Sequence, residues 1–111
     1  MAFSVNLNFN KQRIKQDGTA TVYIQVIVDG IRELLNMHFV WPANLIDTKG
    51  GLLIPRFRSD VEHADYSIIL SSEFNKINEI QRMARLAGRE LTMQEFRNEY
   101  KSFENKGDFT A

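Results

Sequence analysis

Seven side chains that can hydrogen-bond to nucleic-acid bases recur along three stretches of the sequence, mostly at alternate positions. The carboxamides of Asn and Gln can bond adenine through two atoms at once, and the Arg guanidinium can bond guanine in the same way. A flat β-ribbon with such groups on one face fits the major groove of double-stranded DNA. The candidate residues are Asn6, Asn8, Tyr23, Gln25, Arg32, Asn36 and His38. An ordinary half-solvated sheet face is also polar, so this pattern alone favours a protein-interaction surface at least as much.

Five further basic residues are candidates for contacts to backbone phosphates. They are Lys11, Arg13, Lys15, Arg56 and Arg58. The balance of charge over the chain counts against nucleic acid, because 14 basic and 14 acidic residues give a net charge of zero. DNA-binding domains usually carry a basic excess. The asymmetry along the chain is mild, with seven cations and five anions in residues 1–60.

No set of residues has the spacing of a catalytic or metal-binding site. Cysteine is absent, and His38 and His63 lie far apart without an acidic ligand set beside them. We interpret Tyr23, Tyr66 and Tyr100 as packing or surface aromatics rather than nucleophiles. We therefore expect a protein that is not an enzyme and that binds no metal, cofactor or small-molecule substrate.

The bulk composition fits one globular domain. The chain has 111 residues, of which 43% are hydrophobic and 25% charged. No apolar run approaches the roughly 18 residues that a membrane span takes. The first residues lack the basic and apolar segments of a signal peptide. We expect a cytoplasmic protein without membrane partners.

Period-2 alternation predicts three strands, at residues 3–10, 19–28 and 31–40. Asp29-Gly30 supplies a strong hairpin signal between the last two strands. We expect Pro42 to end the third strand, since proline lacks a ladder donor. The side chains expected on the buried face are Val5, Leu7, Val22, Ile24, Val26, Leu35, Met37 and Phe39.

The second half of the chain changes to helical periodicity. Helices are predicted at about residues 61–87 and 93–103, and residues 105–111 look like a linker. The apolar stripe expected on the first helix is Ala64, Ile68, Ile69, Phe74, Ile77, Ile80, Ala84 and Leu86. Ser59 or Asp60 is expected to cap this helix and Gly88 to end it. The fold class is therefore α+β, a three-stranded antiparallel sheet packed on a long helix, followed by a short second helix.

The succession of segments resembles the N-terminal arm-type DNA-binding domain of tyrosine recombinases, the integrases of phages and of mobile elements of the Bacteroides type. The resemblance rests on the run A-T-V-Y-I-Q-V-I-V-D-G-I-R at residues 20–32 and on Trp41-Pro42. It extends through D-T-K-G-G at residues 47–51 and G-R-E-L-T-M-Q-E-F at residues 88–96. The match covers nearly the whole chain in order and spacing.

This resemblance implies that the sheet docks in the major groove of arm-type sites in double-stranded DNA. Catalysis in such recombinases lies in a separate C-terminal domain, so residues 1–104 are expected to be a non-catalytic DNA-binding domain. Residues 105–111 would then lead to the rest of the recombinase chain, in a bacterial cytoplasm. Gln25 stands where many relatives have Arg, Ile31 where Lys is common, and Leu45 where Trp is usual. We expect modest affinity with strong salt dependence.

The main alternative is a protein-interaction module that uses the sheet face or an edge strand, and a double-stranded RNA binder is a distant third. Clustering of the basic residues around Asn8, Gln25 and Asn36 would favour DNA. An exposed apolar patch formed by Ile27, Leu34 and Val40 would favour a protein partner.

Overall fold

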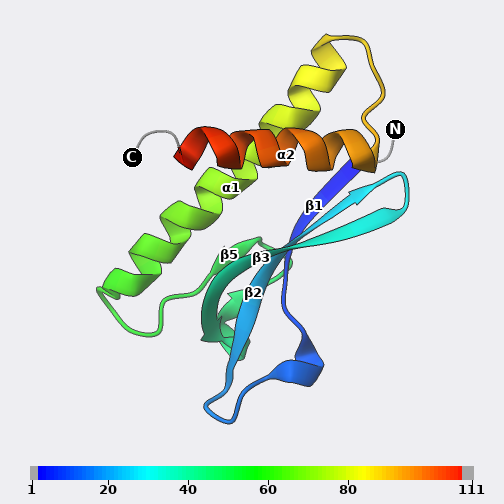
Figure 1. Cartoon of the computed structure of the whole chain (residues 1–111). Coiled ribbons are helices and arrows are strands. Elements are labelled where there is room, and N and C mark those ends of the chain that lie inside the picture. The colour runs from blue at the N-terminus through cyan, green and yellow to red at the C-terminus, as the bar shows by residue number, and fades with distance from the viewer. Residues whose placement is uncertain (1–2, 109–111) are drawn as a thin grey trace.

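The computed structural model describes the backbone of residues 3–108 and the side chains of residues 3–102, in an α+β fold (Figure 1). A three-stranded antiparallel sheet has the order β1-β2-β3, and both helices pack on its inner face. A small two-stranded ladder joins β4 to β5. The elements are β1 Phe3–Asn8, a 3-10 turn Lys11–Arg13, β2 Thr19–Val28, β3 Ile31–Pro42, a 3-10 turn Ala43–Leu45, β4 Ile46–Asp47, β5 Leu52–Leu53, α1 Val61–Leu86 and α2 Met93–Asp108.

The hairpin between β2 and β3 forms where the sequence predicts it. Val28 pairs with Ile31, so the loop has two residues. Asp29 and Gly30 have φ values of 49° and 83°, the positive pair that a type I′ turn takes. This turn matches the right-handed twist of the strands, and it fixes which residues of β3 face the same side as their partners in β2.

A bulge interrupts β3 halfway and was not predicted. Tyr23 pairs with Asn36 and Thr21 pairs with Val40, so β3 contains two extra residues in this interval. His38 lies in the bulge with φ 63°, and its backbone N–H donates to Asn36 Oδ1 at 2.7 Å. Because the bulge adds two residues, Asn36 and Val40 stay on the same face of the sheet, and β3 curves around the core (Figure 1).

The ends of two strands differ from the prediction. β1 ends at Asn8 rather than at residue 10, because Asn8 Oδ1 accepts from the N–H of Phe9 at 2.8 Å. Asn10 then caps the 3-10 turn through the N–H of Gln12. β3 continues to Pro42, which pairs with Thr19. Proline is tolerated there because β3 is an edge strand and Pro42 is its last residue.

The apolar stripe predicted for α1 is half right. Ile77, Ile80 and Ala84 are buried and Phe74 is partly buried, as expected. Ala64, Ile68, Ile69 and Leu86 are exposed, which corrects the prediction, and the buried Leu70 was missed. Apolar residues occupy both sides of this helix, so periodicity alone could not determine which side meets the sheet.

The helix ends follow local capping rules. Asp60 caps α1 by accepting from the N–H of His63 at 3.3 Å. Gly88, with φ 71°, donates to the carbonyl of Arg85, and Arg89 donates to the carbonyl of Ala84, which is a Schellman motif. The last helical residue is thus Leu86, one before the predicted end.

The second helix is longer than predicted. Thr92 Oγ1 accepts from the N–H of Glu95 at 3.1 Å at its start, which caps the helix. α2 continues to Asp108 rather than ending at residue 103, so residues 105–108 are helical and not an irregular linker. Residues 109–111 of the expected linker lie outside the described residues.

We expect Ile77→Ala to lower the free energy of unfolding by about 2–4 kcal/mol, because Ile77 has 0% exposure and the substitution leaves a cavity. Ile68→Ala is the matched control on the same helix. Ile68 is 68% exposed, so its loss should change the free energy of unfolding by less than about 0.5 kcal/mol. Urea denaturation followed by circular dichroism measures both. Equal losses in the two variants would contradict the assigned inner face of α1.

Candidate functional site

The outer face of the sheet carries most of the polar residues predicted to contact bases. The pairing register places Asn6 opposite Gln25, Asn8 opposite Tyr23, and Tyr23 opposite Asn36. A polar row of Asn8, Tyr23 and Asn36 therefore crosses all three strands, from the end of β1 to the middle of β2 and β3. Arg32 lies farther along β3, where it pairs with Ile27.

Two carboxamides of this face bond each other. Asn8 Nδ2 donates to Gln25 Oε1 at 3.2 Å, across β1 and β2. Because the backbone N–H of Phe9 bonds the Asn8 oxygen, the Asn8 side chain is held at both ends. Asn36 is engaged as well, since its oxygen accepts from the N–H of His38. The oxygen atoms of these amides are thus used in bonds within the sheet. The NH₂ groups of Gln25 and Asn36 remain able to donate hydrogen bonds to a ligand.

His38 departs from the predicted alternation. It lies in the β3 bulge, where its backbone has left-handed geometry, and it is exposed. His38 belongs to the rim of the outer face rather than to the polar row.

The loop between β1 and β2 brings basic side chains onto the same face. A hollow of about 430 Å³ is lined by residues that include Asn8, Lys11, Arg13, Tyr23 and Arg32. A second hollow, of about 180 Å³, is lined by Asn10, Arg13, Lys15, Thr21 and Tyr23. We call Lys11, Arg13, Lys15 and Arg32 the basic cluster. Among the described residues, none of these four side chains forms an ion pair with a carboxylate.

Hydrogen bonds within the loop hold the basic cluster in place. The N–H of Lys15 donates to the carbonyl of Thr19 at 2.8 Å, and that of Gly18 donates to the carbonyl of Lys15 at 2.9 Å. Asp17 accepts from the Thr19 hydroxyl at 2.6 Å and from its N–H at 3.0 Å. The hydrogen bond from the Thr19 side chain lowers the pKa of Asp17 below its ordinary value. The loop is therefore anchored to the start of β2.

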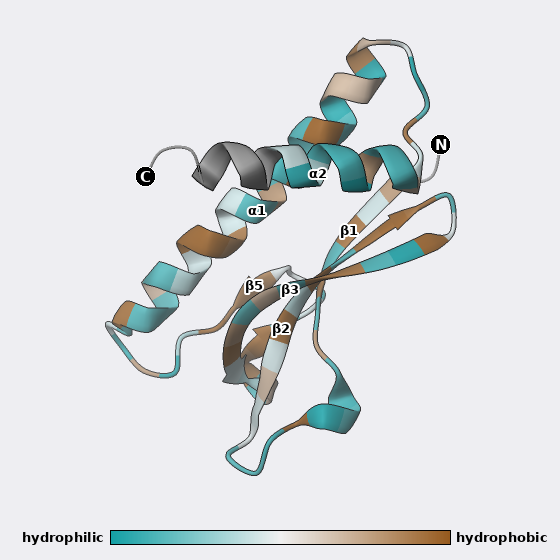
Figure 2. Ribbon diagram, viewed as in Figure 1, coloured by the Kyte–Doolittle hydropathy of each residue, from teal (hydrophilic) through white to brown (hydrophobic). Residues whose placement is uncertain are grey.

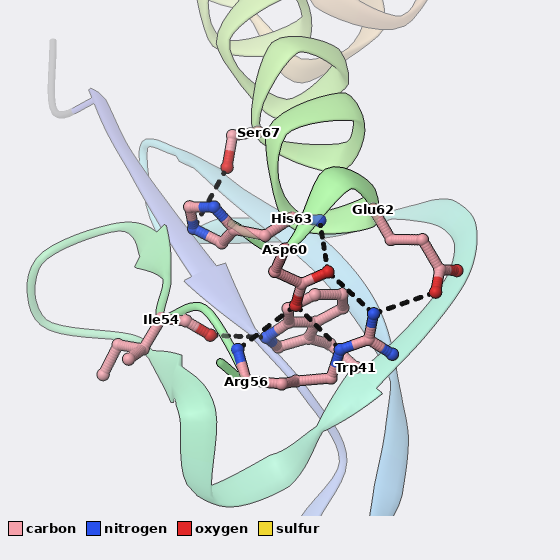
Figure 3. A network of polar contacts seen from close by, with 7 residues as sticks. All are labelled: Trp41, Ile54, Arg56, Asp60, Glu62, His63 and Ser67. Atoms are coloured by element: carbon pink, nitrogen blue, oxygen red, sulfur yellow. Dashed lines mark hydrogen bonds and ion pairs between the residues drawn. The ribbon is translucent and has the colours of Figure 1, made fainter. Parts of the chain in front are cut away.

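Arg56, which the sequence suggests as a phosphate contact, lies apart from the basic cluster and is bonded to carboxylates. Its Nε and Nη2 donate to the two oxygens of Asp60, each at 2.8 Å, and Nη2 also donates to Glu62 at 2.8 Å (Figure 3). The guanidinium lies 4.7 Å from the centroid of the Trp41 ring. Two carboxylates and an aromatic face thus occupy this cation. Arg58 is exposed in the same loop and lines neither hollow.

Polar contacts around Arg56 connect the β4–β5 region to the start of α1. Trp41 Nε1 donates to the carbonyl of Ile54 at 3.0 Å (Figure 3). The ring nitrogen Nε2 of His63 lies 2.8 Å from the carbonyl of Leu53. The hydrogen bonds from Arg56 hold the pKa of the Asp60 carboxyl well below its usual range. Sequence reasoning missed this network, although an arginine four residues before a capping aspartate was a signal for it.

The structure offers no clear site for metal chemistry in the part it describes. His38 and His63 lie on different elements, and no group of three or more His, Cys, Asp or Glu side chains in residues 3–102 is placed to hold an ion. None of the helices described combines the length and apolarity needed to cross a bilayer.

The apolar patch that would favour a protein partner is only partly present. Leu34 is 45% exposed and the neighbouring Ile31 is 54% exposed, near the hairpin end of β3. Ile27 and Val40 are half-buried. The two types of surface lie beside each other, since Leu34 also lines the larger hollow of the basic cluster.

Comparison of the chain with protein-family models, with curated proteins and with solved structures gives no match.

We expect Asp60→Asn to destabilise the fold at neutral pH, because it removes the charge that Arg56 binds. The carboxyl has a lowered pKa in the folded state, so it stabilises the fold above its unfolded-state pKa of about 4, and this contribution is lost as the pH falls through the folded-state pKa. The gap between the urea midpoints of wild type and variant should be largest above about pH 5 and should narrow toward pH 2. Asp65→Asn, an exposed position on the same helix, is the control and should show no such gap. A gap that is independent of pH would contradict the charge assignment.

Proposed function

We propose that this chain is a non-catalytic DNA-binding domain of a site-specific tyrosine recombinase, which docks the outer face of its sheet into the major groove at arm-type sites. The observation that carries the proposal is the juxtaposition of the basic cluster with the polar row on that face. Lys11, Arg13 and Arg32 line one hollow together with Asn8 and Tyr23.

The basic cluster and the polar row suit different parts of the duplex. Cations at the edge of a reading surface bind phosphates and set the register, while amides near its centre bond base edges. Asp17 interacts electrostatically with Lys15, but among the described residues no side chain of the basic cluster forms an ion pair, so its charge is available to an anionic partner. The family assignment itself rests on the sequence resemblance.

A protein partner is the second candidate, and the exposed Ile31 and Leu34 favour it. Two isolated apolar side chains at a hairpin end are common on protein surfaces. The unpaired cations beside them are the more specific feature, so we favour DNA over a protein as the partner.

We expect Lys11→Ala and Arg13→Ala each to weaken binding to duplex DNA about threefold to tenfold at roughly 0.1 M salt. Each lost phosphate contact should also lower the slope of log K against log salt concentration by about 0.9. Fluorescence anisotropy with labelled duplexes, tiled across the ends of the parent mobile element, measures both quantities. Lys101→Ala removes an exposed cation from α2 and is the matched control. No binding of wild type to any duplex at about 0.02 M salt would overturn the proposal.

We expect Gln25→Ala to reduce sequence discrimination more than overall affinity. A bidentate amide contact to adenine contributes about 1–3 kcal/mol of discrimination against the wrong base. Competition between the preferred duplex and duplexes with single base-pair changes measures this loss. Ser4→Ala is the control, because Ser4 is an exposed residue of β1 on the same outer face as Gln25. It should leave the sequence preference unchanged. A uniform loss of affinity across all duplexes would assign Gln25 to positioning instead of base recognition.

A further inference from the structure

The turn between β4 and β5 places a cation beside the free edge of β1. β4 contacts β1, and a hollow of about 270 Å³ at this edge is lined by residues that include Asn6, Thr48, Lys49, Gly50 and Gly51. Lys49 is exposed, and it forms no ion pair within residues 3–102. Its ammonium group is therefore open to an anionic ligand at the edge of the sheet.

Hydrogen bonds to Asp47 hold this turn in one conformation. Asp47 Oδ1 accepts from the N–H of Gly50 at 2.9 Å, and the Asp47 carbonyl accepts from the N–H of Gly51, also at 2.9 Å. Gly51 has φ 71°, and a Cβ on Gly50 would lie 2.5 Å from the Asp47 carboxylate, so the conformation requires both glycines. The carboxylate of Asp47 thus bonds the backbone of the turn, and the two glycines leave space beside Lys49 for a ligand.

Lys49 and Arg32 lie at opposite edges of the sheet. β1 and β3 are the outer strands, and Arg32 belongs to β3, whereas the Lys49 hollow includes Asn6 of β1. The other cations of the basic cluster come from the β1–β2 loop. Figure 2 shows the 3-10 turn of that loop as a hydrophilic segment beyond the end of β1. Cations therefore border the outer face along both of its long edges.

The width of the sheet suits the major groove. Neighbouring strands lie about 4.8 Å apart, so the two outer strands of this sheet are separated by about 10 Å. The major groove of B-DNA is about 12 Å wide. A sheet whose strands run along the groove then has one edge strand beside each of the two sugar-phosphate backbones.

We propose that Lys49 binds a backbone phosphate on the DNA strand opposite to the one that Arg32 contacts. The ammonium of Lys49 donates to the phosphate oxygens, and the hydroxyl of Thr48 in the same hollow is a second donor. Contacts to both backbones fix the position of the polar row between them. This inference rests on the proposed function and adds to it a second phosphate contact, which sets how the sheet lies in the groove.

Fluorescence anisotropy of the 111-residue chain with the preferred duplex tests the contact. Lys49→Ala should weaken binding about threefold to tenfold at roughly 0.1 M salt and lower the slope of log K against log salt concentration by about 0.9. Lys49→Arg keeps the charge and should stay within about twofold of wild type. Lys101→Ala, which removes an exposed cation from α2, is the control and should leave both quantities unchanged. Circular dichroism of every variant checks that the fold is intact.

Replacing single phosphates of the duplex by uncharged methylphosphonates identifies the strand. A replacement at the phosphate bound by Lys49 should weaken wild type and Arg32→Ala but have no further effect on Lys49→Ala, because the contact is already lost. The phosphate identified in the same way for Arg32 should lie on the other strand. Both phosphates on one strand would overturn the inference.

The outcomes separate this inference from the proposed function. Wild-type affinity in Lys49→Ala would overturn the Lys49 contact and leave the DNA-binding proposal intact. A wild-type chain that binds no duplex would overturn both.

Discussion

The inner side of β2 is completely buried, and the placement of the candidate site depends on this burial. Four of its five inner side chains have 0% exposure, namely Val22, Ile24, Val26 and Val28. Because side chains of a strand alternate with a period of two, a slip of one residue would move this whole apolar set into water. Burying each such side chain contributes about 1.5–3 kcal/mol, so the slipped register is strongly disfavoured. Tyr23 and Gln25 are thereby held on the outer face, where the neighbouring strands add Asn6, Asn8 and Asn36.

The parts of the fold that depend on neighbouring residues could be predicted from the sequence. Asp29-Gly30 specifies its turn through its own backbone preferences, and Gly88 ends α1 in the same way. The bulge at His38 and the buried side of α1 could not be predicted, since both depend on packing between segments far apart in the chain. Both faces of β3 and α1 carry apolar residues, so periodicity left two solutions and tertiary contacts selected one.

The candidate site shows the same division between local and distant causes. Alternation along the strands predicted which amides share a face, but not that Asn8 and Gln25 bond each other or that Asn36 supports the bulge. The distribution of charge also depends on contacts between distant residues. Carboxylates pair with several cations outside the site, namely Arg56, Lys76, Arg82, Arg89 and Arg97. The four cations of the basic cluster form no ion pair among the described residues, so a zero total is compatible with a local positive potential there.

The exposed apolar residues of α1 and the basic cluster lie on opposite sides of the molecule. α1 packs on the inner face of the sheet and its exposed apolar residues face away from the sheet, while the basic cluster lies on the outer face. A ligand bound to the outer face of the sheet would therefore leave the exposed side of α1 accessible.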